Sequence, residues 1–153
     1  MWERLRRFSA LERRARGIFL RAAALLPLIS LSLRLRGFRK TQSFFQRFLS
    51  APNNEADSLV SDRADLTVSM VRAAVRHSVG HPTCLEESLG LWWLLARQGI
   101  ATELRIGVRK HGEKFEAHAW VERAGTALNE PESLHEHYAA FDAALSSTPP
   151  GPQ

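Results

Sequence analysis

The sequence has one cysteine among its 153 residues, Cys84. A single thiol excludes an intramolecular disulfide and any metal site built from several thiolates. Cys84 is therefore either a small packing residue or a reactive group. The rest of the composition, with 44% hydrophobic and 24% charged residues, is that of an ordinary globular chain of one domain.

A long hydrophobic run is also lacking. The uncharged stretch "AAALLPLISLSL" covers only residues 22–33 and lies between Arg21 and Arg34. A membrane-spanning helix needs about 20 apolar residues, so this stretch is too short to predict one. It is not followed by a small-residue cleavage site, so a signal peptide is not favoured either.

Acidic residues are scarce near the N-terminus. Residues 1–47 hold twelve Lys and Arg but only Glu3 and Glu12 as acids, a net charge of +10, whereas the rest of the chain has a net charge of −5. Such asymmetry indicates an acidic partner, a membrane surface or a solvated face. We expect an acidic protein or peptide partner. Nucleic-acid binding is not expected, because the basic residues lack interleaved aromatics or a recognised reading motif.

The first part of the chain predicts helices. Two basic helices are expected at Trp2–Leu26 and Pro27–Phe48, with Pro27 at a break or in a first turn. A loop, "SAPNNEAD", follows, and apolar residues at helical spacing then predict a helix over Ser58–His77. The predicted organisation is an N-terminal arm (1–49) that packs on a core (57–145), with a disordered tail (146–153).

The stretch "HPTCLEESLGLWWLL" contains Cys84. Thr83 and Glu86 have the spacing of a capping box, and Gly99 is a typical stop, so a helix is expected over Cys84–Gln98. Cys84 would be its first residue. Free N–H groups and the positive end of the helix dipole favour a thiolate there and can stabilise an oxyanion.

Alternating apolar residues predict strands over Thr102–Val108 and Lys114–Glu122, followed by a short strand, "TALNE". If Arg123–Gly125 is a three-residue loop, Glu122 lies opposite Thr126, and His118 lies opposite Glu130. A carboxylate on the adjoining strand would then orient His118, which in turn would activate the thiol of Cys84.

The run from "CLEESLGLWWLLARQGI" through "IGV" to "AHAWVERAGTALNE" resembles the leader peptidases of lasso-peptide biosynthesis, a transglutaminase-like family of the bacterial cytoplasm. The resemblance implies an α+β, papain-like core in which a central helix carrying the cysteine packs on a small antiparallel sheet. By motif, Cys84 would be the nucleophile and His118 the general base and acid. The family's aspartate falls on Glu130. Asn129 is the alternative orienting residue, in the papain manner.

The resemblance also implies partners. The basic helices before residue 57 match a stand-alone protease, which would work with a separate leader-recognition protein, the precursor peptide and an ATP-dependent lasso cyclase. No cofactor is implied. No metal is expected, because the histidines show no ligand spacing with Cys84, although "HEH" (His135–His137) is a weak exception. A transglutaminase-type acyltransferase and a non-catalytic adaptor with a docking arm remain as alternatives.

Overall fold

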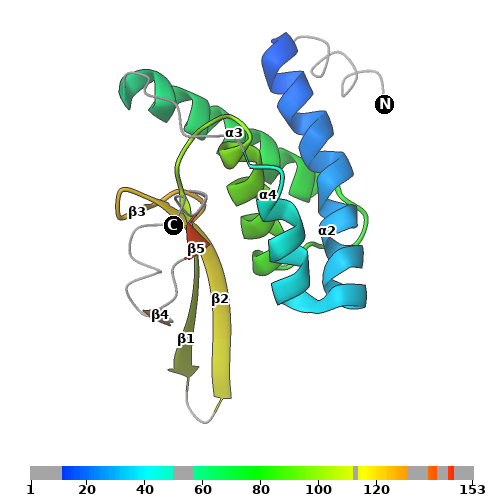
Figure 1. Cartoon of the computed structure of the whole chain (residues 1–153), viewed down its shortest axis with the longest axis vertical. Helices are drawn as coiled ribbons and strands as arrows, with labels where there is room; N and C mark the ends of the chain where they lie inside the picture. Colours follow the sequence, from blue (N-terminus) through cyan, green and yellow to red (C-terminus); the bar gives the residue numbers. More distant parts are fainter. Residues whose placement is uncertain (1–11, 50–56, 112–113, 131–137, 141–144, 147–153) are drawn as a thin grey trace.

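The computed structural model describes residues 12–49, 57–111, 114–130, 138–140 and 145–146. Its elements run in the order α2 (Arg13–Gln46), α3 (Asp57–His77), α4 (Cys84–Ala96), β1 (Glu103–His111), β2 (Lys114–Arg123), β3 (Thr126–Ala127), β4 (Ala139–Ala140) and β5 (Leu145–Ser146). The three helices gather on one side of the β1–β2 hairpin (Figure 1). The fold is α+β, as predicted. The first predicted residues of the arm, most of the predicted loop and tail, and His135–His137 lie outside the described residues.

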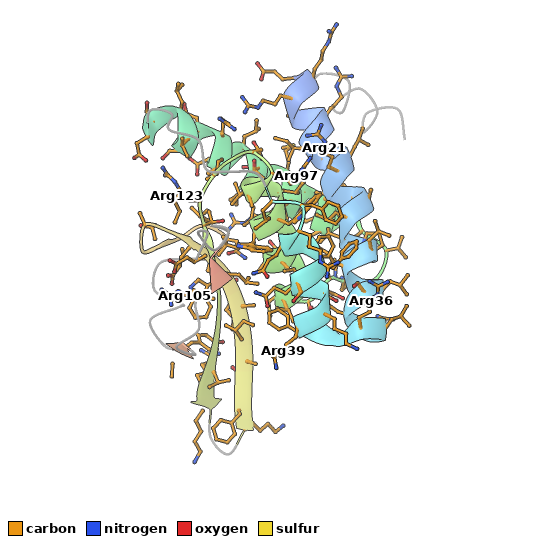
Figure 2. The ribbon with its side chains drawn as sticks, viewed as in Figure 1. Arg21, Arg36, Arg39, Arg97, Arg105 and Arg123 are labelled. Atoms are coloured by element: carbon orange, nitrogen blue, oxygen red, sulfur yellow. The ribbon has the colours of Figure 1, made fainter. Side chains whose placement is uncertain are left out.

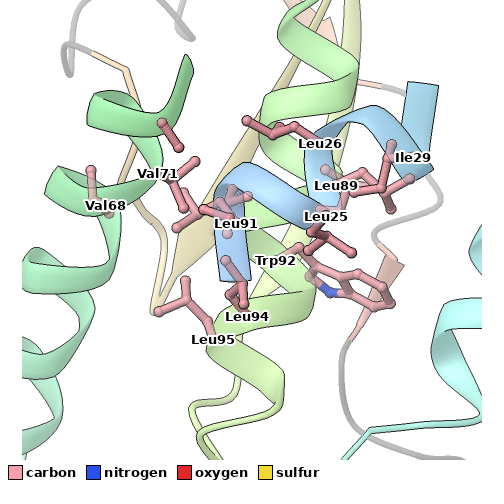
Figure 3. Packing of buried hydrophobic residues seen from close by; sticks show 14 of the residues in the cluster. Leu25, Leu26, Ile29, Val68, Val71, Leu89, Leu91, Trp92, Leu94 and Leu95 are labelled. Atoms are coloured by element: carbon pink, nitrogen blue, oxygen red, sulfur yellow. The ribbon is translucent and has the colours of Figure 1, made fainter. Parts of the chain in front are cut away.

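Helix α4 is the central element of the core. Its residues are apolar on nearly all sides, which suits a helix that is covered all round. It packs against α2, α3, β1 and β2, and Leu89, Trp92 and Leu95 are completely buried. Leu26 and Ile29 of α2 and Val71 of α3 belong to the same cluster (Figure 3). The arm therefore contributes directly to the core on which the cysteine-bearing helix rests.

The break in the arm lies at Gly37 rather than at Pro27, so the prediction of a helix boundary at Pro27 was wrong. Pro27 is inside α2, whereas Gly37 has φ 73° and ψ 173°, a backbone conformation that side chains other than glycine rarely adopt. The hydroxyls of Ser32 and Thr41 are 2.9 Å apart. In a straight helix, nine residues would span about 13.5 Å, so the chain bends sharply between these two residues.

By length and composition, helix α2 could cross a membrane. No other helix among the described residues meets this criterion. An 18-residue window has a mean hydropathy of 1.8, and 28% of that window is buried. The buried residues, among them Ala22, Leu25 and Ile29, pack against the other helices. Leu20, Leu28, Leu31 and Leu35 are exposed. One side of α2 thus completes the core while another presents leucines to solvent.

The sheet has the strand order β3-β2-β1-β4, and β5 also pairs with β1. β1 pairs antiparallel with β2 from Glu103 opposite Glu122 to His111 opposite Lys114, with Gly107 opposite His118. The predicted register of the next hairpin was wrong by one residue. Ala124 (φ 49°) and Gly125 (φ 81°) form a two-residue turn, and Glu122 pairs with Ala127 instead of Thr126. β3 ends at Ala127, so Glu130 lies beyond the strand.

Candidate active site

Cys84 is the first residue of α4, as the capping pattern predicted. Thr83 has extended backbone angles, and its hydroxyl accepts a hydrogen bond from the Glu86 N–H at 3.3 Å. The Glu86 carboxylate accepts one from the Thr83 N–H at 2.7 Å. At the other end of the helix, Gly99 has φ 73°, and the N–H of Ile100 donates to the Leu95 carbonyl at 3.1 Å. Both ends of the helix are fixed by local sequence, and Cys84 is half-buried at its N-terminus.

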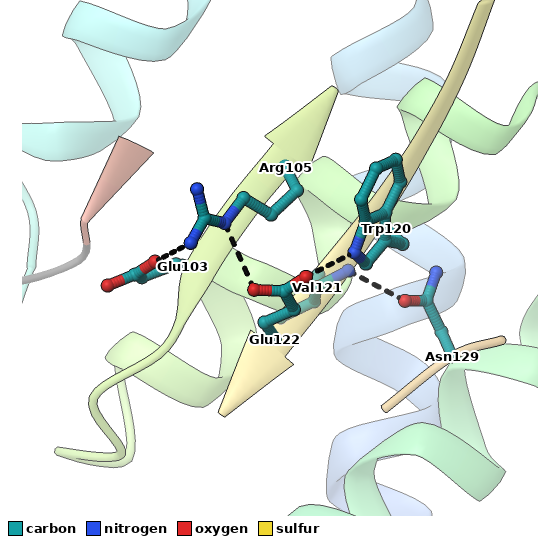
Figure 4. Close-up of polar contacts among 6 residues, drawn as sticks. All are labelled: Glu103, Arg105, Trp120, Val121, Glu122 and Asn129. Atoms are coloured by element: carbon teal, nitrogen blue, oxygen red, sulfur yellow. Dashed lines mark hydrogen bonds and ion pairs between the residues drawn. The ribbon is translucent and has the colours of Figure 1, made fainter. Parts of the chain in front are cut away.

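A buried polar network holds the first turns of α4 against β2. The Ser88 hydroxyl, one turn after Cys84, donates to the Ala119 carbonyl at 2.8 Å. Asn129 bridges the two elements: its amide nitrogen donates to the Ser88 hydroxyl at 2.9 Å, and its oxygen accepts from the Val121 N–H at 2.8 Å. Figure 4 shows the latter contact. Because Ala119 follows His118, the network brings the N-terminal end of α4 to the part of β2 that carries the histidine.

His118 faces a carboxylate. Its Nε2 lies 2.9 Å from Glu130 Oε1, and the two side chains are 15% and 18% exposed. The distance is that of an ion pair, but the buried Nε2 has no well-directed hydrogen bond. A separation of 2.9 Å with poor alignment still leaves the two groups in contact, and a small rotation of either side chain would direct the hydrogen bond. Glu130 is thus the carboxylate that the structure places against the His118 ring.

Asn129 is occupied elsewhere. Its side chain is used at both ends by Ser88 and Val121, and the residue is 7% exposed. These contacts give Asn129 a structural role in joining α4 to the sheet. The sequence could not distinguish the two neighbouring candidates, because Ser88 is 41 residues away in the chain. The assignment of the orienting role to Glu130 stays a prediction, now with a contact behind it.

Two aromatic rings surround His118. The Trp120 ring is stacked at 6.2 Å from the imidazole centroid, and the Tyr138 ring is tilted at 5.2 Å. Gly107 makes room for them, because a Cβ there would lie 2.9 Å from atoms of both Trp120 and Tyr138. Arg109 lies over Tyr138, 4.8 Å from its centroid. Sequence analysis missed Tyr138, whose only signal was its aromatic character.

Trp120 is held in turn by a chain of charged groups. Its indole N–H donates to Glu122 at 2.7 Å, and Arg105 pairs with Glu122 at 3.0 Å and with Glu103 at 3.1 Å (Figure 4). These residues lie on the same face of the sheet as His118, because alternate strand residues point the same way. The ring that stacks on the imidazole therefore has a fixed orientation.

Glu87 is a second carboxylate near the histidine, and the sequence did not single it out. Burial raises the pKa of Glu87; the charge of Glu130 also raises it, while Arg72 and His118 act in the opposite direction. Glu87 is three residues after Cys84 and therefore on the same side of the helix. The small effect of the His118 charge on the pKa of Glu87 agrees with the Ser88–Ala119 hydrogen bond, which joins the first turns of α4 to this part of β2.

The described residues contain no group of three or more His, Cys, Asp or Glu side chains placed to hold a metal ion. His77 instead makes an edge contact with Phe19, with ring centroids 6.3 Å apart. The described residues thus contain a half-buried thiol at the N-terminus of α4 and, on the sheet side on which α4 packs, an imidazole in contact with a carboxylate. These groups suit nucleophilic acyl transfer.

Comparison with known proteins gives one match. The family model for the transglutaminase-like superfamily matches residues 25–141, which is more than half of the chain. No curated protein and no solved structure matches. The match includes Cys84, His118 and Glu130, and it begins inside α2.

Proposed function

This chain belongs to the transglutaminase-like superfamily, and on that premise we propose that it is a cysteine peptidase that removes the leader from a lasso-peptide precursor. The observation that carries the proposal is the 2.9 Å contact of His118 with Glu130 beside the helix that begins with Cys84. The resemblance of the sequence around these residues to lasso leader peptidases supplies the substrate.

In the proposed mechanism, the Cys84 thiolate attacks the carbonyl carbon of the peptide bond between leader and core. The N–H of Cys84, which as the first residue of α4 has no carbonyl one turn earlier in the helix to bond to, stabilises the oxyanion together with a neighbouring donor. The C–N bond then breaks, and His118, as imidazolium, gives its proton to the departing core amine. The leader is left as a thioester on Cys84.

Water completes the reaction. His118 takes a proton from the water as it attacks the thioester carbonyl, the C–S bond breaks, and the leader leaves as a carboxylate. Glu130 keeps His118 oriented and stabilises the imidazolium that forms in each half-reaction. The second product is a core peptide with a free N-terminal amine, the group that an ATP-dependent cyclase would need to close the ring.

We also propose that a separate leader-recognition protein presents the precursor. The described residues before α3 form a kinked helix, whereas a fused recognition domain would be expected to consist of alternating strands. Arg21, Arg36 and Arg39 all project from α2 and are exposed (Figure 2). They offer a cationic surface to an acidic partner or leader. A cytoplasmic location is part of the same proposal.

The direct test is cleavage of the precursor by the chain and its recognition protein, followed by mass spectrometry. Cys84→Ala should lower the rate by at least about 10³-fold while the circular dichroism spectrum and Tm stay unchanged, because the thiol is the attacking group. Undiminished cleavage by Cys84→Ala would refute the peptidase proposal. If the wild type binds the precursor but cleaves nothing, the adaptor alternative is supported instead.

Adding a primary amine to the same reaction separates peptidase from acyltransferase. A peptidase gives a leader with a free carboxylate, and an acyltransferase gives a leader amide whose mass includes the amine. The superfamily assignment is compatible with both outcomes, since each proceeds through the same thioester. We expect the free carboxylate to be the dominant product.

A further inference from the structure

A groove lies at the N-terminal end of α4, on the side of the helix that packs on α2 and α3. It has a volume of about 680 Å³ and lies between α2, the end of α3 and the segment 78–82. Its walls include Leu26 and Leu31 of α2, together with Val79, Pro82 and Glu86. This size is within the range of about 300–1,000 Å³ that is usual for small-ligand pockets, so the groove has room for more than one side chain.

The groove borders the N-terminal end of α4, where Cys84 is the first residue. Pro82 is two residues before Cys84, and Glu86 is two residues after it. Two extended residues span at most about 7 Å, so the groove begins within roughly two substrate residues of the thiol. His118 approaches the same end of α4 from β2, on the other side. A peptide whose carbonyl lies at Cys84 would therefore have the imidazole on one flank and the groove on the other.

The free surface of the groove is apolar. Leu31 is 54% exposed and Val79 is fully exposed, although both are large hydrophobic residues. Glu86, the acid in the wall, already has partners in Ser30, Thr83 and Arg34. Burial raises the pKa of Glu86, but the hydrogen bonds from Ser30 and Thr83 and the charge of Arg34 have the larger combined effect, so the pKa is lowered. The rest of the lining is mainly apolar, and the His77 ring in it packs edge-on against Phe19.

We propose that this groove binds an apolar segment of the substrate peptide, with aliphatic or aromatic side chains, next to the bond that is cleaved. The proposal rests on the proposed peptidase function and adds to it the chemical class that the enzyme selects. Covering Leu31 and Val79 removes apolar surface from water, which favours binding of apolar over polar side chains at this place.

The test uses the single thiol and does not require turnover. Cys84 is alkylated with iodoacetamide and with N-hexyl iodoacetamide, and the two second-order rate constants are measured by intact-protein mass spectrometry. Because the chain has no other cysteine, every adduct reports on Cys84. We expect the hexyl reagent to react at least about tenfold faster, since each methylene that enters the groove leaves water.

Leu31→Glu and Val79→Glu should each abolish most of this preference and leave the iodoacetamide rate within about twofold of the wild type. Leu35→Glu is the matched control, because Leu35 is 75% exposed one turn further along α2 and does not line the groove. Equal rates for the two reagents in the wild type, or an equal loss in Leu35→Glu, would overturn the proposal. Failure of the peptidase function appears separately, as absence of precursor cleavage with the reagent preference intact.

Discussion

The first turns of α4 separate two surfaces of different chemistry. Toward β2, Ser88 and Asn129 form a buried hydrogen-bonded network beside the His118–Glu130 pair. Toward α2, the same turns border a groove whose lining is mainly apolar. Directed polar contacts fix atoms within tenths of an ångström, which chemistry requires, whereas an apolar wall accepts several shapes of the same class. The N-terminal end of α4 thus lies between a polar side, where hydrogen bonds fix the side chains, and a permissive side toward α2, which can accept side chains of different shape.

The largest effect is expected on the polar side, from Glu130→Gln. This change keeps the size of the side chain but removes the charge that stabilises the imidazolium, so kcat should fall by about 10²–10⁴-fold. The matched control is Glu116→Gln, which removes an exposed acid from β2 that pairs with Arg109. Precursor cleavage is measured for both variants. Equal, small losses would remove Glu130 from the active site and reopen the assignment of the orienting residue.

Asn129→Ala should act on stability instead. It removes the acceptor of the buried Val121 N–H and leaves the Ser88 hydroxyl with only its bond to the Ala119 carbonyl, which costs about 1–3 kcal/mol in the free energy of unfolding. Denaturant unfolding measures this loss, and Ser88→Ala alone and combined with Asn129→Ala shows the coupling. Additive losses would contradict a shared network. Activity per folded molecule should fall much less than in Glu130→Gln; the reverse ranking would make Asn129 the orienting residue.

Short sequence patterns correctly predicted the helix that carries Cys84, because its ends are determined by neighbouring residues. Thr83, Glu86 and Gly99 specify the ends of α4, so the position of Cys84 at the first turn was readable from the sequence. The β2–β3 register was not, because Ala124 adopts a positive φ that a non-glycine residue rarely shows. His118 and Glu130 still meet, although the predicted register that paired them was wrong.

The sequence did not predict several contacts between residues that are far apart in the chain. The contact of Asn129 with Ser88 and the packing of Tyr138 on His118 each join residues far apart in the chain. The helix break is a different kind of failure. Proline is the commoner helix breaker, but Pro27 is accommodated inside α2, and the bend falls where Gly37 permits a positive φ.

On the permissive side, charge reversal tests whether α2 guides the partner. Arg36→Glu with Arg39→Glu should lower kcat/KM several-fold when the recognition protein is present, because exposed charges steer association. High salt should produce the same loss in the wild type, since the Debye length is about 8 Å at physiological ionic strength. The control is Arg76→Glu, which reverses an exposed charge in the last turn of α3. Arg105 is not used for this purpose because its side chain pairs with Glu122.

If the rate of the Arg36 and Arg39 double variant equals that of the wild type at every salt concentration, these arginines are solvated surface residues that do not guide a partner. Residues Arg13 and Arg14, at the start of α2, provide a second pair for reversal. A loss from one pair only would locate the partner along the helix. Arg6 and Arg7, which the charge pattern also indicated, lie outside the described residues.

The smallest effect is expected from Glu87→Gln, a change on the polar side of α4 that is measured as a shift in Tm. The pKa of Glu87 is raised, chiefly by burial, so the folded protein binds this proton more tightly than the unfolded chain does. Stability from this group is therefore greatest at low pH and falls as pH rises from the unfolded value through the raised folded value. Glu87→Gln removes the buried charge, and Tm at pH 7 should rise by a few degrees at most.

The difference in Tm between Glu87→Gln and wild type should shrink as pH is lowered below the ordinary carboxyl value of 4.5, because the wild-type side chain is then protonated in both states. Glu103→Gln, an exposed acid on β1, is the control and should show no such convergence. Destabilisation by Glu87→Gln at pH 7 would mean that the carboxylate serves as a partner of His118. The polar side of α4 would then contain two carboxylates acting on one imidazole, and Glu130→Gln alone would understate their combined contribution.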